Sequence, residues 1–119
     1  MNLEIEGFWS SRAGDYNPQK ALTTIPTDYR FFYRLKHDTK ERVKVLTSIL
    51  IDGKRAVCIH DWLSPDGRED NYFDVPLEYR TPGRHQLQFK AYEPESPAAD
   101  AKAGKEIYAS EIFTLAFTH

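Results

Sequence analysis

VKVLTSILIDGKRAVCIHDW, residues 43–62, is the stretch that decides the fold. Hydrophobic residues alternate with other residues on both sides of Asp52 and Gly53, and a period of two is that of a β-strand. Asp-Gly is a strong signal for a two-residue hairpin, because both turn positions need a positive φ. The stretch therefore predicts two antiparallel strands, at 43–51 and at about 54–62.

The same period continues along the rest of the chain. Five further strands are expected at about 2–9, 28–37, 71–75, 84–92 and 106–118, the last as one strand or a strand pair. Residues 10–27 form a long connection, and residues 93–105 are expected to be mobile. Seven short strands with no helical period predict a single all-β domain over residues 1–119, folded as a seven-stranded Greek-key sandwich.

The run PGRHQLQFKAYE, residues 82–93, resembles the penultimate strand of immunoglobulin-like and fibronectin type III-like domains. Those families share a Pro-Gly turn and alternating apolar residues that end in Ala, often with a Leu upstream, here Leu77. The resemblance implies an immunoglobulin-like sandwich with a binding or structural role. His85 departs from the family's corner tyrosine and Leu87 from its second cysteine, and no Trp lies in the second or third strand.

Composition and charge exclude several classes of protein. The formal net charge of -2 gives no overall attraction to nucleic acid or to an anionic membrane. No apolar run approaches the roughly 20 residues of a membrane span, and the acidic start of the chain is unlike a signal peptide. Cys58 is the single cysteine, which excludes an internal disulfide and favours a reducing compartment. We therefore expect a cytoplasmic protein.

The titratable residues give little support to catalysis, and we expect neither an enzyme nor a cofactor. His60 and Asp61 are neighbours in a strand, so their side chains point to opposite faces. Cys58 and His60 share a face, but no third group is in view to orient them. His85 lies on the core side of its strand, which favours a buried, hydrogen-bonded role.

Carboxylates near the 61–74 loop are the strongest candidates for a metal site, because calcium prefers oxygen ligands. Their spacing does not match an EF-hand, and no Cys/His spacing supports zinc. We expect no metal, and calcium at this loop is the alternative. The residues concerned are Asp61, Asp66, Glu69, Asp70 and Asp74.

The charges are unevenly distributed. Residues 30–55 hold eight basic and three acidic residues, whereas residues 61–78 hold six acidic residues and Arg68. One strand face in the basic region carries Arg30, Phe32, Arg34 and Lys36. Stacking combined with phosphate contacts is the chemistry of a single-stranded nucleic-acid platform. The other interpretation is that residues 10–27 cover the aromatic ring while the bases are solvated.

The preferred functional surface is the outer face of the sheet formed by the third, fourth, sixth and seventh strands. The residues expected on this face are Leu46, Leu50, Cys58, His60, Trp62, Tyr92 and Ile112. A solvated face of an antiparallel sheet should be polar, and an apolar surface of this size usually marks an interface. Trp and Tyr are also frequent interface anchors. The alternative is that residues 10–27 fold over this face.

These observations predict a non-enzymatic protein-binding module, such as an adaptor, an inhibitor or a phage-derived interaction protein. It would bind a protein partner, or dimerise, through Leu46, Leu50, His60, Trp62, Tyr92 and Ile112. The basic region would steer an acidic partner. One alternative is single-stranded nucleic-acid binding through the face of Arg30 and Lys36, which the negative net charge disfavours. The other is a structural component of a virion or appendage.

Overall fold

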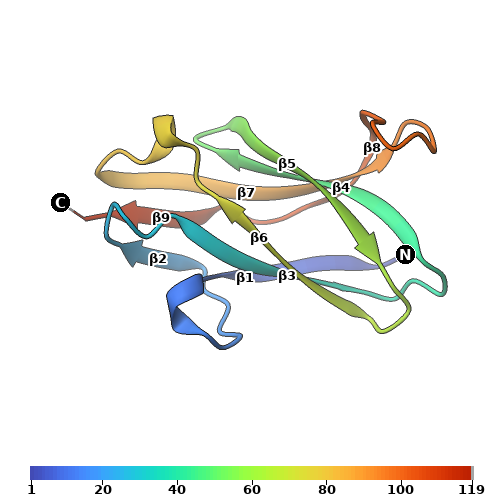
Figure 1. Cartoon of the computed structure of the whole chain (residues 1–119), viewed down its shortest axis with the longest axis horizontal. Helices are drawn as coiled ribbons and strands as arrows, with labels where there is room; N and C mark the ends of the chain where they lie inside the picture. Colours follow the sequence, from blue (N-terminus) through green and yellow to red (C-terminus); the bar gives the residue numbers. More distant parts are fainter. Residues whose placement is uncertain (119) are drawn as a thin grey trace.

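The computed structural model describes residues 1–118, which fold as two β-sheets packed into an elongated sandwich of 44 × 27 × 22 Å (Figure 1). The smaller sheet is antiparallel and has the order β1 (Leu3–Ser10), β3 (Arg30–His37), β6 (Arg68–Asp74). The larger sheet has the order β2 (Ala21–Thr24), β9 (Phe113–Phe117), β7 (Gly83–Pro94), β4 (Val43–Ile51), β5 (Lys54–Leu63), and β8 (Ala103–Ala109) pairs with the end of β7. β2 and β9 run parallel, and every other pair is antiparallel.

The hairpin predicted from the sequence is present. Asp52 and Gly53 have φ values of 53° and 80°, as the two-residue turn requires, and Ile51 pairs with Lys54 directly behind them. β4 has the predicted bounds and β5 ends one residue later than predicted. Asp52 is the only non-glycine residue with a positive φ in the described chain.

The core lies between the sheets and is built largely from aromatic rings. Phe31 contacts Phe73 (ring centroids 5.9 Å apart), Phe73 contacts Phe89 (6.1 Å), and Phe89 contacts Phe113 (5.8 Å). All four rings are buried, and they come from both sheets. Burying each ring contributes about 2–3 kcal/mol by area. The side chains of Phe31 in β3 and Phe89 in β7 therefore point into the core.

Residues 1–118 contain nine strands instead of the expected seven. β2 lies within the segment 10–27, where the sequence ALTT is too short to show a period. β8 starts at Ala103, inside the segment expected to be mobile, and residues 110–112 separate it from β9. Between the two strands the Ser110 hydroxyl accepts a hydrogen bond from the Phe89 N–H (2.9 Å), so a side chain interrupts the ladder.

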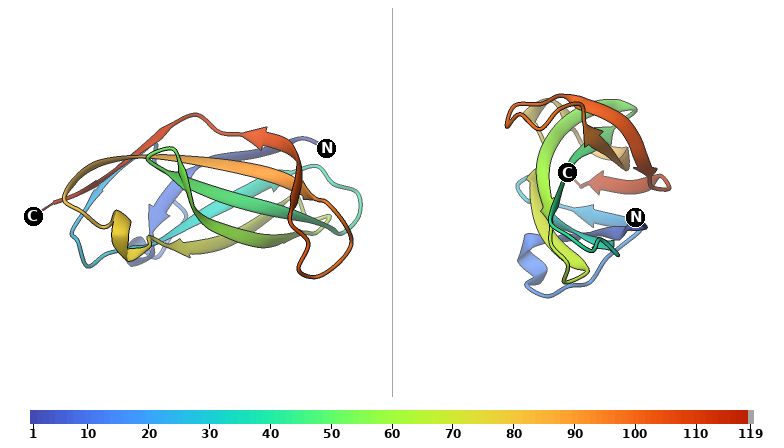
Figure 2. Two further views of the ribbon diagram at one scale, coloured as in Figure 1. Left: turned by 90° about the horizontal axis from the view of Figure 1, so that it is seen from above. Right: turned by 90° about the vertical axis from the view of Figure 1, so that its right-hand side faces the viewer.

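β6 begins at Arg68, three residues before the predicted strand. Its first half is polar because that part of the strand lies at a sheet edge with its alternate residues in solvent. Figure 2 shows β6 beside β3 in the smaller layer, with β7 and β9 in the other layer.

Two single turns of 3₁₀ helix, η1 (Ser11–Ala13) and η2 (Leu77–Tyr79), complete the described elements. Neither of these helical turns in residues 1–118 has the length or apolar character needed to cross a membrane.

Candidate functional site

The strand register places the predicted docking residues on one surface. Leu46 in β4 lies opposite His60 in β5 and opposite Tyr92 in β7, and Trp62 lies opposite Lys44. Residues directly opposed in an antiparallel pair project from the same side of the sheet. We call this surface the outer β4 face. It comprises Lys44, Leu46, Ser48, Leu50, Cys58, His60, Trp62, Gln88, Lys90, Tyr92 and the neighbouring Ile112.

Exposure differs strongly across the outer β4 face. Trp62 is 49% exposed and Ile112 is 54% exposed, and His60 is also exposed. Leu50 and Tyr92 are half-buried. Leu46, by contrast, is only 1% exposed, because it lies on the central strand β4 with a neighbouring strand on each side. It forms the floor of the face and cannot itself contact a partner.

Residues 10–27 do not fold over this face. Tyr16 packs edge-on against Trp9 (5.1 Å) on the smaller sheet, and Gln19 exchanges backbone hydrogen bonds with Phe8. β2 then continues along the far edge of the larger sheet. The loop before β8 comes nearer instead, since the Lys44 ammonium donates to the Ala99 carbonyl (3.1 Å).

Two arginines lie over the aromatic rings of the outer β4 face. The Arg42 guanidinium is 4.3 Å from the centroid of Trp62, and that of Arg55 is 5.8 Å from the centroid of Tyr92. Neither arginine forms an ion pair within residues 1–118. Cation–π contacts of this kind contribute about 0.5–1 kcal/mol at exposed sites and leave the positive charge available.

Ser48 lies at the centre of the outer β4 face, between Cys58 and Lys90. It is fully buried, and its hydroxyl is the only buried side-chain polar atom in the described residues that lacks a hydrogen-bond partner. Leaving such a group unsatisfied costs about 1–3 kcal/mol.

On the outer side of the smaller sheet, each predicted basic residue is paired with an acid. Arg30 donates twice to Asp74 (2.7 and 3.1 Å), and Lys36 donates to Glu6 (2.6 Å). Arg34 also donates twice, to Asp70 of β6. Hydrogen bonds from Arg34 and Arg30 lower the pKa of Asp70 and Asp74, which keeps these carboxylates ionised.

Phe32 lies in a row of aromatic rings on this smaller sheet. It stacks on Trp9 (5.7 Å) and meets the edge of Tyr72 (5.9 Å). Tyr16 and Arg34 close one end of the row around a hollow of about 170 Å³. The row provides stacking surfaces, but the surrounding cations are already neutralised by carboxylates.

The acidic residues near the 61–74 loop do not converge on one point. Asp61 is buried in the core, and Asp70 and Asp74 are paired with arginines. Asp66 and Glu69 remain, and together with His37 their ligand atoms lie within 4.8 Å of one another.

Hydrogen bonds account for two members of the cluster, His37 and Glu69. The two carboxylate oxygens of Glu69 contact the Ser64 N–H (2.9 Å) and His37 Nε2. The Thr39 N–H points to His37 Nδ1 (3.4 Å), so Nε2 carries the proton that it donates to Glu69. A metal would need that nitrogen deprotonated. The arrangement fastens the β5–β6 turn to the end of β3.

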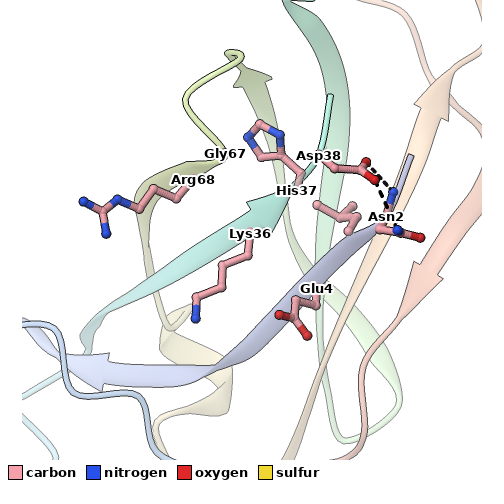
Figure 3. Close-up of a pocket in the computed structure, with 8 residues that line it drawn as sticks. Asn2, Glu4, Lys36, His37, Asp38, Gly67 and Arg68 are labelled. Carbon is pink, nitrogen blue, oxygen red and sulfur yellow. Dashed lines mark hydrogen bonds between the residues drawn. The ribbon is translucent and has the colours of Figure 1, made fainter. Parts of the chain in front are cut away.

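A pocket of about 470 Å³ opens next to His37, at the N-terminal end of β1 (Figure 3). Its rim carries both signs of charge, with Glu4 and Asp38 near Lys36 and Arg68. Asp38 is held by two hydrogen bonds from Asn2, drawn as dashed lines in Figure 3. A rim that carries both signs of charge favours neither an anionic nor a cationic ligand.

Sequence analysis missed a buried polar network around Asp61. The hydroxyls of Tyr33 and Thr47 donate to its Oδ2 (2.8 and 2.6 Å), and the Asn71 side chain donates to its Oδ1 (2.6 Å). Burial, followed by the negative charge of Asp61, raises the pKa of Tyr33 and keeps its hydroxyl a donor. The sequence contained a signal for this network, because the alternation along β5 places the side chain at position 61 on the inward face of the strand.

His85 is buried and hydrogen-bonded, as predicted. Its Nδ1 contacts the Asp52 carboxylate (2.7 Å) and its Nε2 contacts the Thr81 carbonyl (2.8 Å). Both partners are acceptors, so both ring nitrogens act as donors. Burial disfavours the charged ring, but these hydrogen bonds outweigh it and raise the pKa of His85. His60 and Asp61 lie on opposite faces, also as predicted.

Comparisons with protein-family models, with curated proteins and with solved structures found no match to this chain.

Proposed function

We propose that this chain is a cytoplasmic, non-enzymatic module that binds an acidic segment of a protein partner on the outer β4 face. The observation that carries the proposal is the half-exposed Trp62 lying against Arg42, a cation with no acidic partner in the described chain. Trp, Tyr and Arg dominate the energetics of protein interfaces. Here all three types occur together on one sheet face.

The charge distribution supports an acidic partner. On the smaller sheet, ion pairs with carboxylates cancel the charges of Arg30, Arg34 and Lys36. On the outer β4 face, Arg42 and Arg55 retain their charge above the aromatic rings. Carboxylates of a partner could therefore pair with the guanidinium groups while apolar side chains contact the rings. Complementary charge would also accelerate encounter.

The predicted immunoglobulin-like Greek-key arrangement is part of this proposal. A three-stranded sheet β1-β3-β6 facing a sheet with the order β9-β7-β4-β5 supports it, as does the parallel pairing of β2 with β9. The seventh predicted strand corresponds to the split pair β8 and β9.

Trp62→Ala tests the docking face. Wild-type protein and the Trp62→Ala variant would each be immobilised and incubated with an extract of the native cells. The proteins that each one retains would be quantified by mass spectrometry. Leu77→Ala is the matched control, because Leu77 is 77% exposed but lies on η2, away from the face. We expect at least one protein retained equally by wild type and Leu77→Ala and reduced at least tenfold by Trp62→Ala. If no retained protein depends on Trp62, the outer β4 face is not a docking site.

Single-stranded nucleic-acid binding is the second candidate, favoured by the aromatic row of Trp9, Phe32 and Tyr72. Titration with labelled single-stranded DNA over a salt series tests it, since phosphate binding must weaken steeply with salt. Salt-sensitive binding that Phe32→Ala abolishes would support this candidate over the protein-binding module.

A further inference from the structure

The open edge of β5 runs beside the outer β4 face, and the register identifies its unpaired backbone groups. The Asp52 N–H donates to the Gln86 carbonyl (2.8 Å), so even-numbered residues of β4 direct their backbone groups toward β7. Odd-numbered residues of β4 therefore face β5 and pair with odd-numbered residues there. It follows that Cys58, His60 and Trp62 direct their N–H and C=O groups to the open edge.

No element of the described chain satisfies these groups. β5 is the last strand of its sheet, and no backbone hydrogen bond outside the sheets involves residues 57–62. The register shift at Arg55 and Ala56 leaves residues 57–63 in regular pairing with β4. Residues 56–60 also contain no formally charged side chain and no Pro.

The other sheet edges are protected in ways that β5 is not. The Tyr108 hydroxyl hydrogen-bonds both the N–H and the C=O of Ile5 in β1, and Phe8 bonds with Gln19. β2 is only four residues long. β6 carries four charged residues and the middle of β8 carries Lys105 and Glu106, whereas residues 56–60 of β5 carry none. Proteins use such devices to prevent pairing at an edge, so β5 is the edge left open to it.

We propose that β5 pairs with β5 of a second copy of this chain, antiparallel and centred on His60, to form one continuous sheet across a two-fold axis. His60 is the centre of the regularly paired segment 57–63, so in this register every residue of the segment lies opposite a residue of the same segment in the other copy. Cys58 then lies opposite Trp62 of the second copy. The outward residues of both copies exchange about six backbone hydrogen bonds, and the contact is self-complementary, as two-fold symmetry requires.

The charges at the ends of the edge identify a second copy as the occupant. Lys54 and Asp66 are both exposed, at opposite ends of the edge, and neither forms an ion pair within the described chain. Antiparallel pairing about His60 places the Lys54 end of β5 in each copy beside the turn that carries Asp66 in the other copy, so opposite charges meet at both ends of the seam. Two outer β4 faces then lie side by side, but the pairing uses backbone groups and does not depend on that face binding a partner.

His60→Pro tests the pairing with little disturbance of the domain. Proline removes the one N–H that lies at the two-fold axis, and it is tolerated where a strand's N–H faces away from its sheet. His60→Ala is the matched control, since it removes the same side chain but keeps the N–H. We expect sedimentation velocity over a concentration series to show a monomer–dimer equilibrium for wild type and His60→Ala, and a dimer at least tenfold weaker for His60→Pro.

Disulfide trapping tests the register without relying on proline. Trp62→Cys places a cysteine opposite Cys58 of the second copy, at a Cα separation of about 5.5 Å, which suits a disulfide. Mild oxidation should yield a covalent dimer for Trp62→Cys. Neither the wild type nor the double variant Cys58→Ser, Trp62→Cys should form one, because identical positions on either side of His60 lie far apart.

A wild-type protein that remains monomeric at every concentration, and no covalent dimer from Trp62→Cys, would overturn the proposal. Equal dimerisation of His60→Pro and His60→Ala would overturn it as well. These outcomes leave the docking function untouched, since that function is read from partner retention by Trp62→Ala. Conversely, an edge-paired dimer with no Trp62-dependent partner would retain this inference and remove the proposed function.

Discussion

At the scale of single residues, the carboxylate of Asp61 connects the two sheets. It accepts hydrogen bonds from Tyr33 and Asn71 in the smaller sheet and from Thr47 in the larger one. Three neutral donors contact it, and it forms no ion pair within residues 1–118. Buried polar groups in such a network make core packing more specific, but removing one member leaves the others unsatisfied.

Asp61→Ala is expected to lower the free energy of unfolding by about 3 kcal/mol, because two buried hydroxyl donors lose their acceptor. Asp61→Asn keeps one acceptor oxygen for Tyr33 and Thr47, so its cost should be smaller, about 1 kcal/mol. Urea unfolding of both variants provides the measurement. Equal values for the two variants, both near zero, would show that the network does not stabilise the fold.

The pair formed by Asp52 and His85 makes stability depend on pH. The raised pKa of His85 means that its contribution is complete below pH 6.5, its ordinary value, and is lost as the pH rises through the higher folded value. For Asp52, burial opposes ionisation, but the bonds from His85 and the Gln86 N–H lower its pKa. The Asp52 contribution is therefore present above pH 3.8 and is lost as the pH falls through the lower folded value.

We therefore expect the stability difference between wild type and His85→Gln to be largest between about pH 4 and pH 6.5 and to shrink toward pH 8. Thermal unfolding of both proteins across this range tests it. A difference that stays constant from pH 5 to pH 8 would mean that folding does not change the pKa of His85.

At the scale of elements, local patterns predicted the strands that carry strong alternation. The Asp52-Gly53 turn and the apolar period around it gave β4 and β5 to within one residue. β2 and the start of β6 were missed, because their sequences, ALTT and REDN, have no apolar period. Their pairing depends on strands far away in the chain, namely β9 and β3. Long-range pairing of this kind leaves no local signal.

The bulge in β1 fixes the segment that follows it. The pairing of β1 with β3 shifts between Ile5 and Phe8, and Gly7 lies in this shift. A Cβ at Gly7 would come within 2.4 Å of the Gln19 carbonyl oxygen. Only glycine therefore permits the close approach that lets Phe8 and Gln19 exchange hydrogen bonds.

Gly7→Ala is expected to destabilise the domain by about 1–3 kcal/mol and to increase hydrogen exchange at the amides of Phe8 and Gln19. Gly14→Ala is a suitable control, because its Cβ would meet nothing within 4 Å and its cost comes only from the positive φ of 76°. The control should lose some stability while both amides stay protected. Identical exchange in the two variants would contradict this role for Gly7.

At the scale of the whole molecule, the two outer faces of the sandwich differ in how far their charged side chains are paired. The uneven charges of the sequence are partly cancelled, because the register of β3 and β6 brings Arg30 to Asp74 and Arg34 to Asp70. Of the remaining cations of that region, Arg42, Lys44 and Arg55 lie at the outer β4 face. The sequence predicted the docking residues as a group but not this division, and not the burial of Leu46, because both follow from the sheet order.

The hydroxyl of Tyr108 hydrogen-bonds the backbone of Ile5, a residue 103 positions earlier. Synthesis on the ribosome therefore delivers Ile5 long before Tyr108. Until β8 emerges, β1 has an open side that can join neighbouring nascent chains. A product truncated before β8 should therefore be prone to aggregation.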